Sequence, residues 1–134
     1  MKKILVIILT FVLLGCNATP KEPLSSDSFQ FTSQDPEYGY TSEKPIELGG
    51  FLTGTKSSGA HIEYFEGLLG PNGEQVNIQR LGSCCAFEDK TMPFGGGLLD
   101  RYQLTYEGQK APAIIYVNLY KFNKPLAPQG FALL

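Results

Sequence analysis

The stretch that decides the fold is Ala113-Ile114-Ile115-Tyr116-Val117-Asn118-Leu119-Tyr120, the most β-rich run in the chain. Alternate side chains of an extended chain point to opposite faces, and here both faces are apolar. One face carries Ile115, Val117 and Leu119, and the other carries Ile114, Tyr116 and Tyr120. A strand that is apolar on both faces is typical of a central position covered on both sides. We therefore predict that residues 113–120 form the central strand of a sheet.

Three further segments predict neighbouring strands. Residues 45–50, 76–85 and 98–106 contain alternating apolar and polar side chains, with glycine, proline or other turn residues between the segments. In the third segment, one predicted face consists of Tyr102, Leu104 and Tyr106, and the other consists of Arg101, Gln103 and Thr105. The tail contains prolines and a glycine, which predict an irregular cap rather than another strand.

Residues 58–69 have helical periodicity instead. Their apolar and acidic side chains fall on opposite faces, namely Ile62, Phe65 and Leu69 against Glu63 and Glu66. Ser57 or Ser58 can cap the start, and Gly70-Pro71 is a strong stop signal. The alternative is a strand that pairs through the turn at residues 70–73. The predicted fold class is α+β, with a small antiparallel sheet of four or five strands and one amphipathic helix packed on it.

The first sixteen residues have the pattern of a bacterial lipoprotein signal. Lys2 and Lys3 precede a largely apolar stretch of 11 residues (4 to 14), whose last two residues begin the motif Leu13-Leu14-Gly15-Cys16. A spanning helix needs roughly 20 apolar residues, so the segment is too short to cross the membrane. An ordinary secreted protein and an uncleaved signal anchor are the alternatives. The small Gly15 directly before Cys16 favours cleavage between these two residues.

Similarity to bacterial lipoproteins implies that Cys16 receives a diacylglyceryl group and then an N-acyl chain such as palmitate. One acyl chain gives only marginal membrane binding, whereas two or three give a stable anchor in the lipid bilayer. In Gram-negative bacteria an aspartate after the lipidated cysteine is associated with retention in the inner membrane, and this chain has Asn17 there. We expect the outer membrane, on its periplasmic face.

Removal of residues 1–15 leaves 134 − 15 = 119 residues, the size of one domain. Residues 16–37 are rich in polar residues and proline and predict a flexible tether, so the single globular domain is expected at residues 38–134. The mature chain has 9 basic residues against 13 acidic ones, because Lys2 and Lys3 are removed. A net charge of 9 − 13 = −4 argues against nucleic-acid binding.

Cys84-Cys85 is the most unusual feature of the predicted domain. With Cys16 lipidated, these are the remaining thiols, in a compartment where disulfides persist. A bridge between adjacent cysteines is strained, because their Cα atoms lie closer together than in an ordinary disulfide. Its uses would be a rigid turn, a contact surface for a ligand, or a redox-sensitive switch. The alternative is that the two side chains point to opposite faces of a strand.

The other candidate site residues give weaker signals. His61 could serve Cys84 or Cys85 as a base, oriented by Asp100, but an exposed place on the helix is the simpler interpretation. A zinc site from the same four residues matches no known ligand spacing. We therefore expect neither a metal nor a cofactor.

A glycine run precedes Asp100 and Arg101. Gly95-Gly96-Gly97 lacks the helix and the lysine of a phosphate-binding loop. These glycines are more simply explained by positive φ angles or by a close approach to the cysteine pair. For Asp100 and Arg101, a pair at the strand edge is favoured over an anion site at Arg101.

Several motifs resemble those of a family of small, uncharacterised bacterial lipoproteins. They are Tyr38-Gly39-Tyr40-Thr41, Gly70-Pro71-Asn72-Gly73, Gly82-Ser83-Cys84-Cys85, Gly96-Gly97-Leu98-Leu99-Asp100 and Tyr106-Glu107-Gly108. The resemblance covers residues 38–131. Members are sometimes labelled 2-dehydro-3-deoxyphosphooctonate aldolase, an activity of (β/α)₈ barrels of about 250 residues. A mature chain of 119 residues cannot form that barrel, so the resemblance implies no catalytic residues here.

The sequence thus favours a non-enzymatic envelope lipoprotein that acts as an interaction or structural module, with an envelope protein as partner. The first alternative is a thiol-redox protein or another small enzyme that uses Cys84 and Cys85. The second is a binder of a small envelope ligand in a pocket lined by Tyr102, Tyr106, Tyr116 and Tyr120.

The anchor gives the first prediction. Replacing Cys16 by serine should abolish lipidation and release or mislocalise the protein, because the acylated thiol is the proposed membrane attachment. Membrane fractionation and mass spectrometry of the mature protein measure both effects. Equal membrane retention of the variant, or a wild-type mass without acyl chains, would contradict the anchor.

Overall fold

The computed structural model describes residues 26–51 and 59–134, so Gly15, Cys16 and the signal segment lie outside the described residues. The main sheet has four strands in the order β1-β5-β4-β3, formed by Ile46–Glu47 (β1), Ala113–Asn118 (β5), Gly96–Thr105 (β4) and Asn77–Glu88 (β3). β5 lies between β1 and β4, as the sequence predicts. Ile115 and Val117 in its middle are completely buried.

The sheet is mixed, which corrects the prediction of a purely antiparallel one. β4 runs antiparallel to both β3 and β5, but β1 is parallel to β5, with Ile46 opposite Val117. Parallel neighbours need a long connection between them, and residues 48–112 supply it. The α+β class, with one α-helix and a small sheet in the described residues, is confirmed.

The single α-helix of the described residues is shorter than predicted. α1 spans Ala60–Glu66 and is bounded by Gly59, in a left-handed conformation, and by Gly67. The predicted caps Ser57 and Ser58 lie outside the described residues. The buried side chains of α1 are Ala60 and Tyr64, whereas Ile62, predicted to face the core, is exposed. A glycine at each end limits the helix to two turns. The periodic pattern over residues 58–69 therefore predicts a helix longer than the one that forms.

The chain after α1 enters a second, two-stranded sheet. β2 (Leu68–Leu69) pairs antiparallel with β6 (Ala132–Leu133) at the C-terminus. The tail predicted as an irregular cap therefore ends in a strand.

None of the helices in the described ranges combines the length and the apolar character needed to cross a membrane.

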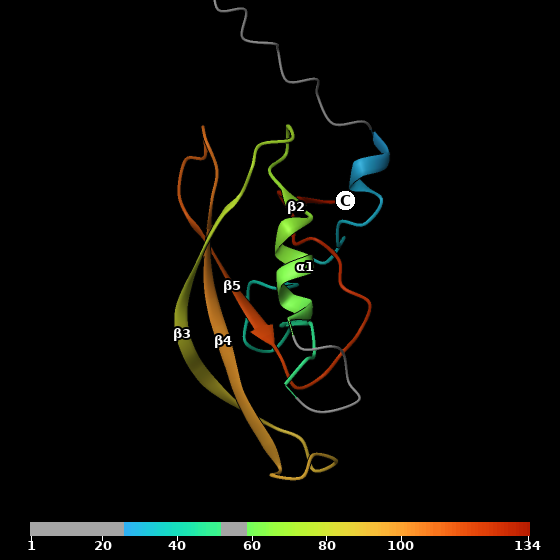
Figure 1. The fold of residues 1–134 in the computed structure, drawn as a ribbon, viewed down its shortest axis with the longest axis vertical. Coiled ribbons are helices and arrows are strands. Elements are labelled where there is room, and N and C mark those ends of the chain that lie inside the picture. Colours follow the sequence, from blue (N-terminus) through green and yellow to red (C-terminus); the bar gives the residue numbers. More distant parts are fainter. Residues whose placement is uncertain (1–25, 52–58) are drawn as a thin grey trace, which may run out of the picture.

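α1 and the C-terminal segment cover one face of the main sheet (Figure 1). The core between them is formed by side chains from both layers, namely Ile46, Leu48, Tyr64, Leu68, Tyr102, Leu104, Ile115, Val117, Ala127 and Phe131. The long β3–β4 hairpin extends beyond α1 at one end of the molecule (Figure 1). Among the described residues, part of the sheet face that bears α1 therefore has no helix over it.

The segment before Tyr38 belongs partly to the folded domain. Ser26–Phe29 forms a 3₁₀ helix (η1), and the backbone N–H of Ser33 donates a hydrogen bond to Ala127 O at 2.8 Å. Thr32 also donates its hydroxyl proton to Phe131 O at 2.8 Å. The composition predicts that the globular domain begins at residue 38. The contacts with the C-terminal segment begin earlier in the chain.

The central strand gives the second prediction. Val117→Asp should destabilise the domain by more than about 3 kcal/mol, because it places an unpaired charge in the buried core. Urea unfolding followed by circular dichroism measures the loss. Phe94→Asp is the matched control, since Phe94 is 86% exposed in the β3–β4 turn and should tolerate the same carboxylate. Similar stability of the two variants would contradict the buried position of β5.

Candidate functional site

β3 is an edge strand interrupted twice. Leu81 is an extra residue between the pairs Arg80–Tyr102 and Gly82–Arg101, and Cys85 is an extra residue between Cys84–Leu99 and Ala86–Leu98. Each bulge bends the strand and breaks its regular hydrogen-bonding row. An interrupted edge is a poor template for pairing with another strand. Binding by strand addition at the outer edge of β3 is therefore disfavoured.

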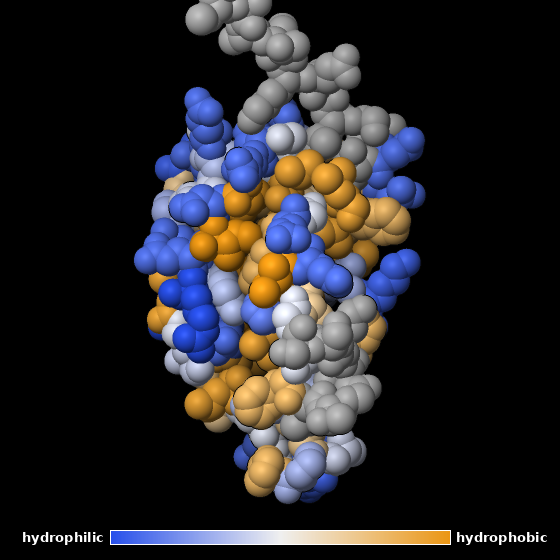
Figure 2. All heavy atoms as spheres, viewed as in Figure 1, coloured by the Kyte–Doolittle hydropathy of each residue, from blue (hydrophilic) through white to orange (hydrophobic). Residues whose placement is uncertain are grey.

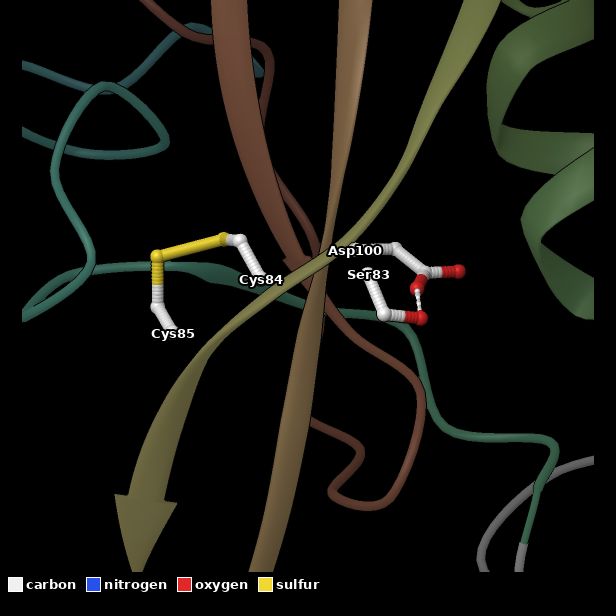
Figure 3. The surroundings of a disulfide bond; sticks show 4 residues. All are labelled: Ser83, Cys84, Cys85 and Asp100. Carbon is white, nitrogen blue, oxygen red and sulfur yellow. Dashed lines mark hydrogen bonds between the residues drawn. A yellow bond between two sulfur atoms is a disulfide. The ribbon is translucent and has the colours of Figure 1, made fainter.

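The second bulge explains how the cysteine side chains meet. In a regular strand, Cys84 and Cys85 would point to opposite faces. Cys85 instead has φ of +31°, and the Sγ atoms of the two residues lie in close contact, side by side in Figure 3. Cys84 is half-buried and Cys85 is exposed. The two thiol groups thus form one surface feature on the edge strand.

The neighbouring Ser83 lies on the other face of the sheet. Figure 3 shows Ser83 and Asp100 together on the side of α1, while the cysteines point away from it. Arg80 reaches the same carboxylate through Nε to Oδ2 at 3.0 Å and through Nη2 to Oδ1 at 2.9 Å. Arg80 Nη2 also donates to Ser83 Oγ at 3.0 Å, and Ser83 Oγ donates to Asp100 Oδ1 at 2.8 Å.

We call these three residues the bulge clamp, because Arg80 and Ser83 lie on either side of the first bulge. Burial by itself would raise the pKa of the Asp100 carboxyl, but the hydrogen bonds from Arg80 and Ser83 outweigh it and hold that pKa below its usual value. Asp100 is therefore ionised and already accepts three hydrogen bonds. The clamp is a hydrogen-bonded structural network that fixes β3 on β4.

The clamp does not have the arrangement of a catalytic triad. The hydroxyl proton of Ser83 is donated directly to Asp100, with no imidazole between them. His61 projects from α1, where its ring packs edge-to-face against Phe65 with centroids 6.4 Å apart. Because Cys84 and Cys85 point away from α1, the dyad considered from the sequence is not assembled.

A hollow of about 250 Å³ adjoins the clamp. Its lining consists of Phe51, Leu98, Leu119 and Tyr120 together with Arg80, Ser83 and Asp100. Phe51 is 65% exposed and Leu98 is 50% exposed at its rim. The ring of Tyr120 packs on Phe51 with centroids 4.7 Å apart. Figure 2 shows apolar residues (orange) interspersed with polar ones over the face that bears α1.

The three consecutive glycines shape the hairpin that carries Leu98. Gly96 has φ of +148°, and a Cβ there would lie 2.0 Å from the carbonyl oxygen of Phe87. A Cβ on Gly97 would lie 2.7 Å from the Tyr120 ring. Gly95, with φ of +72°, belongs to the turn. The expected close approach is thus real, but it is to Phe87 and Tyr120 rather than to the cysteines.

The same turn is tied to the segment after β5. Lys121 forms an ion pair with Asp89. The hydrogen bond from Lys121, assisted by those from Thr91, lowers the pKa of Asp89 to about 2. The position of the hairpin end relative to Tyr120 is therefore held by charge as well as by packing.

Arg101 does not form the ion pair with Asp100 that the sequence predicts. The favoured pair between Asp100 and Arg101 is not formed, because neighbouring strand residues point to opposite faces and Asp100 binds Arg80 instead. Arg101 shares a face with Leu99, which lies opposite Cys84. Its Nε atom is buried and has no hydrogen-bond partner in the described part of the chain.

The four tyrosines proposed to line one pocket lie in different places. Tyr102 packs on Phe65 in the core, and Tyr106 packs edge-to-face on Phe131. Tyr120 lies against Phe51 and Phe87 at the hairpin end. Tyr116 lies opposite Arg101, on the face that also carries the cysteines.

Among the residues that the structure describes, no group of three or more His, Cys, Asp and Glu side chains is suited to hold a metal ion. The zinc ligands considered from the sequence are separated, since Asp100 and the cysteines lie on opposite faces.

The chain matches no protein-family model, and it has no significant match among curated proteins or among solved structures. The functional assignment therefore depends on the geometry of the chain itself.

The clamp gives the third prediction. Asp100→Asn should lower stability at pH 7 by about 1 to 3 kcal/mol, because the partners of a buried carboxylate lose their charged acceptor. The folded-state pKa of Asp100 is depressed, so its contribution is complete above the unfolded value of about 3.9 and disappears as the pH falls through the lower folded value.

Urea unfolding from pH 7 to pH 2 tests this prediction. The wild type should lose more stability than Asp100→Asn below about pH 4. Glu107→Gln, which removes a carboxylate in the exposed turn after β4, is the control and should behave like the wild type. Parallel pH profiles for the wild type and Asp100→Asn would contradict the role of the carboxylate.

Proposed function

We propose that this chain is a lipid-anchored envelope lipoprotein whose globular domain is a non-enzymatic interaction module. The signal segment ending at Gly15, followed by the lipidation position Cys16, supports the anchor and an outer-membrane location facing the periplasm. The partners are then the bilayer, through the acyl chains, and an envelope protein bound by the domain.

The observation that supports binding is the exposed apolar rim beside an internally hydrogen-bonded polar network. Phe51 and Leu98 expose large apolar side chains at the hollow next to the clamp. The polar groups beneath them already bind one another, so they are poorly suited to activate a substrate. An apolar side chain from a partner would fill the hollow and remove both rim residues from water, which is favourable at roughly 25 cal/mol per Å².

We further propose that Cys84 and Cys85 are joined by a disulfide in the oxidising envelope. Their sulfur atoms lie in contact, and Cys85 occupies the bulge that allows this contact. A bridge between adjacent residues closes almost no loop, so it contributes little to stability by constraining the unfolded chain. Its structural use is to hold the bulge in one conformation on the exposed edge strand.

Site-specific photo-crosslinking in intact envelopes gives the fourth prediction. A photoreactive residue at Leu98 should form a discrete crosslinked product, because this side chain lies at the proposed contact. The same probe at Gln103, on the opposite face of β4, is the matched control and should give little product. Phe51→Ser should weaken the Leu98 product while leaving the urea midpoint nearly unchanged. No product at Leu98, or equal products at both positions, would contradict the proposed surface.

A further inference from the structure

The two cysteines are unequally accessible. Cys85 is exposed on an edge strand, whereas Cys84 is half-buried opposite Leu99, which is fully buried. Thiol–disulfide exchange requires an incoming thiolate to approach one sulfur and expel the other. In a bridged pair, the geometry selects Cys85 Sγ as the attacked atom and Cys84 Sγ as the leaving atom.

The backbone favours opening of the bridge. Cys85 has φ of +31°, a conformation that a residue with a Cβ seldom adopts. Contact between adjacent sulfurs requires the bulge conformation, but two separate thiols do not. Reduction removes the covalent constraint between the two sulfurs, so Cys85 can leave this unfavourable φ within the bulge, which releases local strain.

The cation placed to stabilise the leaving sulfur is Arg101. It lies on the same face of β4 as Leu99, which is directly opposite Cys84, so Arg101 and Cys84 are diagonal neighbours. Diagonal neighbours lie about 7 to 8 Å apart at the backbone, within reach of a long side chain. Arg101 Nε is buried without a partner among the described residues, and a buried N–H donor without an acceptor is costly. A thiolate on Cys84 would supply that acceptor.

We propose that the Cys84–Cys85 pair is a thiol–disulfide exchange site that accepts electrons from an exposed dithiol on another protein, with Arg101 as a positioning residue for the Cys84 thiolate. This inference rests on the disulfide proposed above and adds a stoichiometric exchange reaction to the proposed binding role. Its substrate class is a reduced Cys-X-X-Cys protein of the envelope.

The exchange balances in two steps. A thiolate of the donor attacks Cys85 Sγ, the bond between the two cysteines breaks, and Cys84 leaves as a thiolate beside Arg101. The second donor thiol then loses its proton to solvent and attacks the mixed disulfide, releasing Cys85 as a thiolate that takes a proton from solvent. The donor is oxidised to its own disulfide, and the cysteine pair is reduced by two electrons.

The test begins with the state of the sulfurs in the full-length lipoprotein purified from envelopes. Alkylation under denaturing conditions, followed by mass spectrometry, should show neither Cys84 nor Cys85 modified and a peptide lighter by two hydrogen atoms than its reduced form. Two alkylated cysteines at this stage would overturn the disulfide, and with it the exchange site.

The second stage uses reduced thioredoxin as the probe. A thioredoxin variant that lacks its second active-site cysteine should trap a mixed disulfide on Cys85, identified by peptide mapping. Trapping on Cys84 would overturn the assigned direction of attack. A bridge that stays oxidised with intact thioredoxin in the native protein, yet is reduced in the unfolded protein, would overturn the exchange site and leave the disulfide standing.

The role of Arg101 has its own measurement. Arg101→Gln should slow reduction by thioredoxin at pH 7 by about five- to tenfold, because a less stabilised thiolate is a poorer leaving group. Arg101→Lys, which retains the charge, should recover part of that loss. Lys110→Gln removes one positive charge from the exposed turn between β4 and β5 and should match the wild-type rate. Equal rates for Arg101→Gln and the wild type would overturn the positioning role.

Discussion

The domain depends on the burial of β5 between β1 and β4. Ile115 and Val117 have no exposed surface and pack against side chains of the α1 layer, while the strand also pairs on both edges. Burial of apolar area is the main favourable term in folding, and a strand apolar on both faces can satisfy it only at the centre. This constraint leaves β3 as an edge strand of the main sheet.

Because β3 is an edge strand, it can depart from regular geometry without disturbing a second neighbour. Two bulges do so, and the clamp formed by Arg80, Ser83 and Asp100 holds the strand across the first of them. The consequence is a sheet edge with two different faces. One face combines an apolar hollow with the hydrogen-bonded clamp, and the other presents the sulfurs of Cys84 and Cys85.

The candidate site could be predicted from the sequence only in part. The adjacent cysteines stand out in the sequence, because no other residue type has their chemistry. The alternation around Leu104 correctly places it on the same face as Tyr102, and both side chains are buried. Arg80 and Ser83 were missed, since an arginine and a serine three residues apart resemble ordinary exposed strand residues. Gly82 was the one available signal of the first bulge, with φ of +117°.

The sequence by itself determined the central strand and the α+β class, because each follows from local periodicity. The lipoprotein signal stays a prediction from a contiguous motif. Only the tertiary structure decided that β1 runs parallel to β5, that Leu133 pairs with Leu68, and that Asp100 binds Arg80 rather than Arg101. These pairings join residues far apart in the chain or depend on a bulge that shifts the register. A local pattern cannot encode them, since the competing partners differ only in where the folded chain places them.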